Sequence, residues 1–294
     1  MLKNILMVLG GAISFGVLTS FVKLAYRQGY NAAEISFVQA LIGAVVLWLV
    51  FFFSKKENAT RKEIPYLLFT GVFIGISTYF YYLSVKYISA SVAIVLLMQF
   101  TWISILLEWA VFKKKPSRSE FAITVLILIG TLLASGLTPS QDISLPIEGI
   151  GYVLLASMVY AAYIVSNSRI GKDVNWQNKS AWTMTGSAIS ILLVNAQTLV
   201  FDHHLGLELL EWGVFLAVFG TILPPVLFAI GIPKIGATTS SLLMTVELPM
   251  AVISAHFILD ESLSTTQVVG IAIMLTSIVM MNLIKSKKRD LLPT

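Results

Sequence analysis

The sequence contains no cysteine and few charged residues. Asp, Glu, Lys and Arg make up 12% of the 294 residues, about half of the share that is usual in soluble globular domains. The absence of cysteine excludes disulfides, thiolate catalysis and cysteine-ligated metals, and the redox state of the compartment cannot be read. A hydrophobic share of 57% and a mean hydropathy of +0.86 argue against a soluble protein.

Signatures of enzymes are also missing. The sequence has no GxxxxGK[ST], HExxH or GxSxG motif and no paired-aspartate calcium loop, so an ATP-driven pump is disfavoured. The neighbours His203 and His204 lack further ligands at suitable spacing. We therefore expect no catalytic residue, no metal site and no cofactor. Any driving force would come from the gradient of a solute or from a coupled proton or other ion.

What the chain does contain is ten apolar stretches. A hydrocarbon core about 30 Å thick needs roughly 20 apolar residues at helical rise. The stretches lie, with ends uncertain by several residues, at 4–26, 34–53, 64–84, 90–112, 121–138, 147–168, 180–200, 210–231, 237–259 and 266–284. The first is too long for a secretion signal and lacks a small-residue cleavage site. The pattern predicts an all-α integral membrane protein with ten transmembrane helices.

The basic residues occupy the termini and every second gap between these stretches. Seventeen of the 20 are Lys3, Lys55, Lys56, Arg61, Lys62, Lys113, Lys114, Lys115, Arg118, Arg169, Lys172, Lys179, Lys234, Lys285, Lys287, Lys288 and Arg289. Only Lys23, Arg27 and Lys86 occupy the other gaps, where seven acidic residues collect. Because basic loops stay in the cytoplasm, both termini are predicted to be cytoplasmic. Since these residues would face an anionic leaflet, the pI near 9.3 does not indicate nucleic-acid binding.

A weak internal repeat accompanies the charge pattern. A shift of 147 residues lays the segment 114–120 on 261–267, and Ile88 and Ala90 on Ile235 and Ala237. Few residues are identical, but the order of spans and loops agrees. We predict two five-span repeats, 1–140 and 141–294, the second with a basic cytoplasmic tail. Because five is odd, the second repeat would be inverted in the membrane, as in many secondary transporters.

Several segments resemble the EamA-type transporters of the drug/metabolite transporter superfamily. They are Ala12-Ile13-Ser14-Phe15-Gly16, residues 83–91, Pro233-Lys234-Ile235-Gly236-Ala237, Glu247-Leu248-Pro249 and residues 260–264. The resemblance covers about residues 5–284. It implies export or exchange of small metabolites such as amino acids, with spans 1–4 and 6–9 around a central cavity and spans 5 and 10 outside. Two residues depart from the pattern: Lys114 replaces the Glu that Glu261 supplies, and Trp102 replaces Pro249.

Glu247 is the foremost candidate for substrate binding. It lies about ten residues into the ninth span, where an ionisable group is costly and is therefore expected to have a function. Pro249 removes a backbone hydrogen bond and is predicted to free the carbonyl of Thr245. An acid beside an open carbonyl can bind a cation, take a proton or hold an amine. The alternative is a protonated glutamic acid that only joins two helices.

Other polar residues in the spans are weaker candidates. Gln99 and Trp102 lie about one turn apart in the fourth span, and Trp102 could either stack on a substrate or pack in the core. Glu108 and His256 come nine residues after Gln99 and Glu247 respectively. At about 100° per residue they should point away from a cavity that Gln99 and Glu247 face. Snorkelling or a helix-to-helix hydrogen bond would then explain both.

Two groups of residues share a helix face at i, i+3 and i+7. They are Tyr79, Tyr82 and Lys86 in the third span, and Tyr160, Tyr163 and Asn167 in the sixth. Such faces can line a wet cavity that holds a polar or aromatic solute. Tyrosines near helix ends can equally form an interfacial belt.

Three further features mark the ends and bends of spans. Lys23 could attract an anion, pair with Glu34 or snorkel. The pair Pro224-Pro225, like Pro249, can act as a hinge or a tolerated kink.

The sequence as a whole favours a secondary transporter that moves amino acids or related polar or amphipathic solutes by alternating access. The expected partners are a small-molecule substrate and membrane lipids, with a monomer or homodimer in the inner membrane of a bacterium. The alternative from another class is an intramembrane enzyme or a lipid- or solute-binding sensor without transport.

Overall fold

The computed structural model describes residues 2–54, 58–88, 90–135, 146–201, 206–260 and 262–290, and these contain helices and no strand. The helices are α1 (Leu2–Arg27), α2 (Ala32–Ser54), α3 (Ile64–Val85), α4 (Ala90–Leu97), α5 (Phe100–Phe112), α6 (Arg118–Ala134), α7 (Ile147–Arg169), α8 (Trp176–Val194), α9 (Ala196–Phe201), α10 (Leu207–Leu216), the π-helix η1 (Ala217–Ile222), α11 (Leu223–Ile235), α12 (Ala237–Met244), α13 (Glu247–Leu259) and α14 (Thr265–Asp290). The predicted all-α class is confirmed for this part of the chain. Outside it lie Lys55, Lys56, Asp142, Asp202, His203, His204 and Glu261.

Among the residues that the structure describes, seven helical stretches are long and apolar enough to cross a membrane. They are Leu2–Arg27, Ala32–Ser54, Ile64–Val85, Val92–Phe112, Ile147–Arg169, Glu208–Ile235 and Ala237–Leu259. A shorter apolar helix, Thr265–Met281, occupies the tenth predicted interval. The two remaining intervals hold α6, which has 17 residues, and α8, whose first turn contains Gln177, Asn178 and Lys179. The count of ten spans therefore stays a prediction.

The fourth and ninth predicted spans are each broken in the middle. The first breaks at residues 98–99, between α4 and α5, and the second at residues 245–246, between α12 and α13. The second break lies 147 residues after the first. Both spans also end on a residue with left-handed backbone, Lys113 at φ 57° and Asp260 at φ 56°. A non-glycine residue adopts this conformation at a cost, and it stops the helix.

The helices that follow begin in matching ways. Ser117 and Glu120 form a capping box at the start of α6. At the start of α14, the Ser264 N–H donates to Gln267 Oε1 at 2.9 Å and the Gln267 N–H donates to Ser264 Oγ at 3.2 Å. Such reciprocal bonds satisfy N–H groups that the first helical turn leaves free. The local conformation thus recurs at an offset of 147 residues, although Gln267 stands where Glu120 is in the first half.

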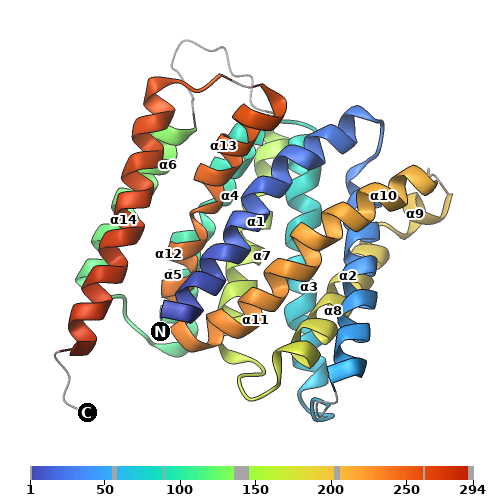
Figure 1. Cartoon of the computed structure of the whole chain (residues 1–294), viewed down its shortest axis with the longest axis horizontal. Coiled ribbons are helices and arrows are strands. Elements are labelled where there is room, and N and C mark those ends of the chain that lie inside the picture. The colour runs from blue at the N-terminus through green and yellow to red at the C-terminus, as the bar shows by residue number, and fades with distance from the viewer. Residues whose placement is uncertain are drawn as a thin grey trace.

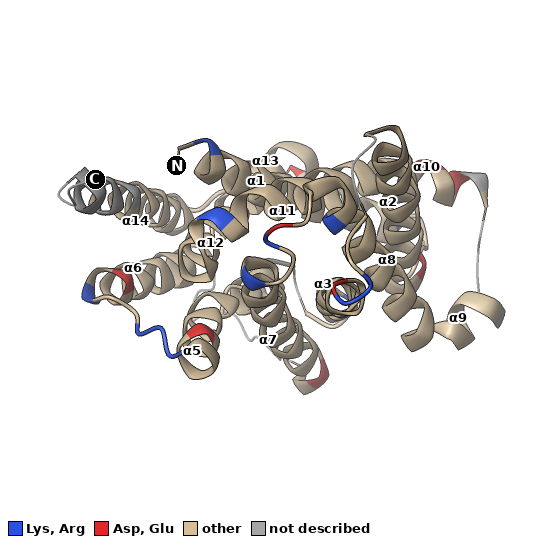
Figure 2. Cartoon of the chain, turned by 90° about the horizontal axis from the view of Figure 1, so that it is seen from below, with Lys and Arg blue, Asp and Glu red and all other residues tan. Residues whose placement is uncertain are grey.

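Most of the helices pack as one bundle, and α6 and α14 lie side by side at its edge (Figure 1). Within the bundle, α1 packs mainly against α11 and α13, and α7 packs mainly against α3 and α5. Helix α2 packs against α8. The view from below separates the α6 and α14 pair from the rest in the same way (Figure 2). The first helix of each predicted repeat therefore lies against helices of the other repeat.

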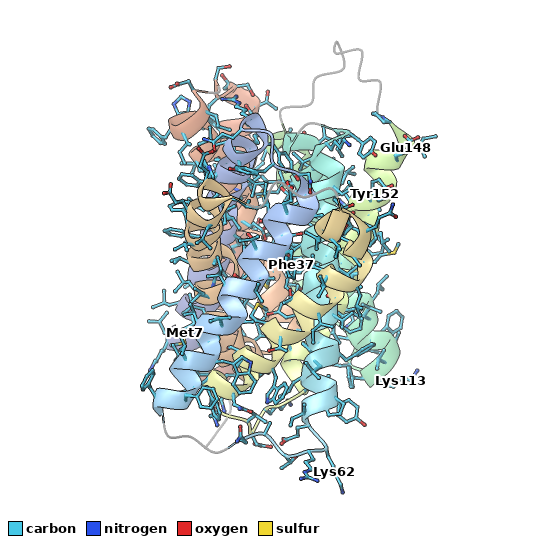
Figure 3. All side chains as sticks on the ribbon, turned by 90° about the vertical axis from the view of Figure 1, so that its right-hand side faces the viewer. Met7, Phe37, Lys62, Lys113, Glu148 and Tyr152 are labelled. Carbon is cyan, nitrogen blue, oxygen red and sulfur yellow. The ribbon has the colours of Figure 1, made fainter. Side chains whose placement is uncertain are left out.

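The two ends of the bundle differ in charge. Lys62 and Lys113 lie at one end, together with the N-terminal part of α1, and Glu148 lies at the opposite end (Figure 3). The N-terminal end of α1 and the C-terminal end of α14 point to the same end of the bundle (Figure 1). Lys62 and Lys113 lie at the opposite end from Glu148 (Figure 3), as the predicted alternation of charge requires.

Candidate functional site

A cavity of about 470 Å³ lies in the middle of the bundle. It is lined by Phe15, Leu18 and Thr19 of α1, Gln39 of α2, Ile74, Ser77, Thr78, Tyr81 and Tyr82 of α3, Leu97 of α4, Tyr160 of α7, Gly220 of η1 and Glu247 of α13. Because the lining residues come from both predicted repeats, the cavity lies between the repeats.

Glu247 is the only charged residue that lines this cavity. It is the first residue of α13, is 5% exposed, and its Oε2 atom has no hydrogen-bond partner. Its position at a helix N-terminus favours a negative charge. The prediction of a free Thr245 carbonyl is wrong, because the Leu248 N–H donates to that oxygen at 3.2 Å. The tighter turn at the helix break supplies the donor that Pro249 removes.

Helix α1 lies unusually close to Glu247. A Cβ atom at Gly16 would come within 3.0 Å of the Glu247 carbonyl oxygen and of Met250. One turn further, the hydroxyls of Ser20 and Ser254 share a hydrogen bond of 2.9 Å. The backbone that carries the carboxylate is therefore held directly against α1.

Tyr160 presents an unpaired hydroxyl to the cavity. Its ring is stacked on Tyr163, with centroids 6.1 Å apart and planes at 4°, and it meets Phe100 edge-on at 4.8 Å. The Tyr160 hydroxyl has no partner, whereas Tyr163 accepts a hydrogen bond of 3.2 Å from Asn167 Nδ2. Tyr163 and Asn167 thus support Tyr160 from behind and do not line the cavity.

The predicted face of Tyr79, Tyr82 and Lys86 is divided between two cavities. Tyr82 lines the central one, where Gln39 Nε2 donates to its hydroxyl at 3.3 Å. Tyr79 and Lys86 line a separate cavity of about 940 Å³ with Tyr26, Tyr30 and Asn31. The Tyr26 hydroxyl donates a 2.8 Å hydrogen bond to the backbone carbonyl oxygen of Tyr82 and so links the two groups of lining residues.

Gln99 and Trp102 lie outside the central cavity. Trp102 is 38% exposed, and its Nε1 donates to Gln99 Oε1 at 2.8 Å. The two side chains therefore bind each other on the surface of the bundle. Residues 98–99 break the helix, so positions read along one continuous span do not give the face on which they lie.

Glu108 is buried and joins three segments at the Lys62 end. One carboxylate oxygen contacts Lys114 Nζ at 3.2 Å and Arg169 Nη2 at 3.0 Å. The other accepts hydrogen bonds from the Thr238 N–H at 3.1 Å and the Thr238 hydroxyl at 2.6 Å. The carboxylate thereby caps α12 and ties it to the ends of α5 and α7. Its role in this structure is that of a structural link.

The remaining charged candidates also lie away from the centre. Lys23 lines a third cavity with Thr19, Ser20 and Ala255. His256 is partly buried, with its ring 5.1 Å from that of Phe257. Neither His256 nor Lys23 is among the residues that line the central cavity.

The prolines Pro224 and Pro225 follow a π-helical turn. Wider turns of this kind occur often at functional sites. Ser14 Oγ donates to the Phe219 carbonyl at 2.6 Å, and Thr221 Oγ1 donates to the Gln39 carbonyl at 2.6 Å. The bend is thus fastened to α1 and α2, and it brings Gly220 to the cavity wall.

Sequence reasoning missed several residues of the site. Gln39 could have been found, because an amide in the middle of an apolar span is costly. Phe15 and Tyr81 carry no such signal, since aromatic residues are common throughout the spans. Lys179, assigned to a cytoplasmic loop, is 1% exposed. Its ammonium group donates to the carbonyls of Asn167 and Ile170, both at 2.8 Å.

Comparison with known proteins gives one family and a matching fold. The profile of the EamA-like transporter family matches residues 2–136 and again residues 147–283. The threonine/homoserine exporter RhtA of Escherichia coli (strain K12) is 27% identical over 249 residues, covering 82% of this chain and 78% of RhtA. The uncharacterized transporter YcbK of Bacillus subtilis (strain 168) is 22% identical, covering 88% of this chain and 86% of YcbK. One protein crystal structure superposes with a TM-score of 0.73 at 13% identity, over 95% of this chain and 98% of that one.

Proposed function

Because the chain belongs to the EamA-like transporter family and is an integral membrane protein, we propose that it is a secondary transporter. It exports or exchanges small metabolites, with amino acids or related amphipathic solutes as the expected substrates. The observation that carries this proposal is the central cavity, which both parts of the chain line and which contains the buried carboxyl group of Glu247, whose Oε2 atom has no hydrogen-bond partner. RhtA, a threonine/homoserine exporter, supports the choice of substrate.

We further propose that the chain consists of two inverted five-helix repeats, residues 1–140 and 141–294. The family profile matches once in each part. Helix breaks, left-handed residues and helix starts recur at an offset of 147 residues. Two such units of opposite orientation can open a shared central site to either side of the membrane by alternating access.

Counterflow in proteoliposomes tests the transport function. Vesicles that contain the purified protein and are loaded with an unlabelled amino acid should accumulate the same labelled amino acid from outside. Protein-free vesicles should show no such accumulation. A panel of amino acids, amines and organic acids identifies the solute that exchanges. If no solute in the panel exchanged, the transporter proposal would fail, and a sensor or an intramembrane enzyme would be favoured.

The orientation can be tested with single cysteines, because the chain has none of its own. Lys172→Cys places a thiol just after the C-terminal end of α7, and Glu148→Cys places one in its first turn, both at exposed residues. We expect a membrane-impermeant maleimide to label Glu148→Cys in intact cells and Lys172→Cys only after lysis. Labelling in the reverse order would show that both termini lie outside.

A further inference from the structure

We propose that the central cavity binds its ligand through a positively charged amino group, so that the substrate class is small organic cations that carry an apolar or aromatic body. This inference rests on the proposed transport function and narrows it. A free carboxylate on the ligand would meet no cationic side chain among the residues that line the cavity. Three features of the structure support the proposal: the acidic side chain in the lining, the aromatic residues around it, and the positions of the basic residues outside the cavity.

The lining contains an acidic side chain and no basic one. Glu247 is its only Asp or Glu, and the residues that line the cavity include no Lys, Arg or His. A buried ionised group is costly without an opposite charge. The Oε2 atom of Glu247 lacks any partner, so an ammonium group in the cavity would supply the missing charge and the missing donor together.

Aromatic rings surround the same space. Phe15, Tyr81, Tyr82 and Tyr160 line the cavity together with Glu247. Ring faces attract organic cations, and aromatic cages are used to hold quaternary ammonium groups. The Tyr160 hydroxyl, also without a partner, can accept a hydrogen bond from an ammonium group.

The basic residues near the interior of the bundle lie outside the central cavity. Lys179 donates to two backbone carbonyls at the end of α7. Lys114 and Arg169 are paired with Glu108. Lys86 lines the separate cavity beside Tyr79. None of these side chains lines the central cavity, so none is placed to balance a ligand carboxylate there.

Three compounds with one ring and similar chains test the proposal directly. Phenethylamine is a cation at pH 7, 3-phenylpropanol is neutral and 3-phenylpropionate is an anion. Isothermal titration of the full-length protein in detergent should give a dissociation constant for the cation at least tenfold lower than for the anion. Equal or tighter binding of 3-phenylpropionate would overturn the proposal. This comparison uses only the wild-type chain.

Variants test whether the preference for the cation comes from the carboxyl group of Glu247. Glu247→Gln keeps the shape and removes the charge, and it should weaken phenethylamine binding at least tenfold while leaving 3-phenylpropanol binding within about twofold. Glu148→Gln, which changes an exposed acid at the start of α7, should bind all three compounds as the wild type does. Unchanged phenethylamine affinity in a Glu247→Gln protein that elutes and melts like the wild type would overturn the assignment.

Counterflow with phenylalaninamide and phenylalanine separates this inference from the transport function itself. The amide lacks the carboxylate, so we expect it to exchange faster. Exchange of phenylalanine alone would contradict the cation proposal and leave transport standing. Tight binding of phenethylamine without exchange of any solute would contradict transport and leave the cation site standing.

Discussion

Replacing Gly71 with leucine is expected to prevent recovery of folded protein from detergent extracts. A Cβ atom at Gly71 would come within 3.0 Å of the Thr183 carbonyl oxygen, and one at Gly186 would come equally close to the Leu68 carbonyl oxygen. The backbones of α3 and α8 are therefore in direct contact, as small residues permit in membrane helices. A leucine must separate them along their length, at a cost we put above about 3 kcal/mol.

The control for this variant is the same substitution at Gly151. This residue is exposed on α7, and a Cβ atom there would have no neighbour within 4 Å. Gly151→Leu should elute as a single peak in size-exclusion chromatography, because leucine also has the better helix propensity. A single peak of normal yield for Gly71→Leu would show that α3 and α8 can separate at Gly71 without loss of the fold.

Replacing Glu108 with alanine should destabilise the folded protein by about 2 kcal/mol, mainly because the buried N–H of Thr238 loses its acceptor. The full cost of breaking a buried ion pair does not apply. The side chains of Lys114 and Arg169 are 50% and 35% exposed, so water can take over their charges. The loss should appear as a melting temperature several degrees lower in detergent.

The matched control is Glu148→Ala, which removes an exposed carboxylate from α7. Its melting temperature should stay at the wild-type value. Glu108→Gln should lie between the two, since the amide can still accept from Thr238 but cannot pair with the two cations. Equal melting temperatures for the wild type, Glu108→Ala, Glu108→Gln and Glu148→Ala would mean that the stability of the protein does not depend on the link between the ends of α5, α7 and α12.

Helix positions were largely predictable from the sequence, because the length of an apolar run and the charges that flank it determine where a span begins and ends. The breaks were not. Pro249 marks the second one, but the first has Trp102 at the corresponding position, and no local residue signals it. The break between α4 (Ala90–Leu97) and α5 (Phe100–Phe112) therefore has no counterpart in the residue pattern.

The site could be predicted only where the free-energy cost of placing a polar group in an apolar span singles out a residue. Glu247 stood out because an acid in an apolar span demands an explanation, and the structure places it in the cavity wall. The faces of Gln99 and of Tyr79 depended on helix rotation relative to neighbours, which helical periodicity alone does not determine. Lys179 was read as a loop residue because a lysine lowers local hydropathy, whatever carbonyls it meets in the folded chain.

The packing of each predicted repeat's first helix against the other repeat has a consequence for the protein's assembly. Helix α1 lies against α11 and α13, and α7 lies against α3 and α5, so neither predicted repeat encloses its own first helix. A gene cut between residues 136 and 147 would produce two fragments that each expose an unpaired helix and half of a cavity wall. Each fragment would need the other to become stable, and together they could reconstitute the carrier. On this packing, the two predicted repeats are not independent folding units.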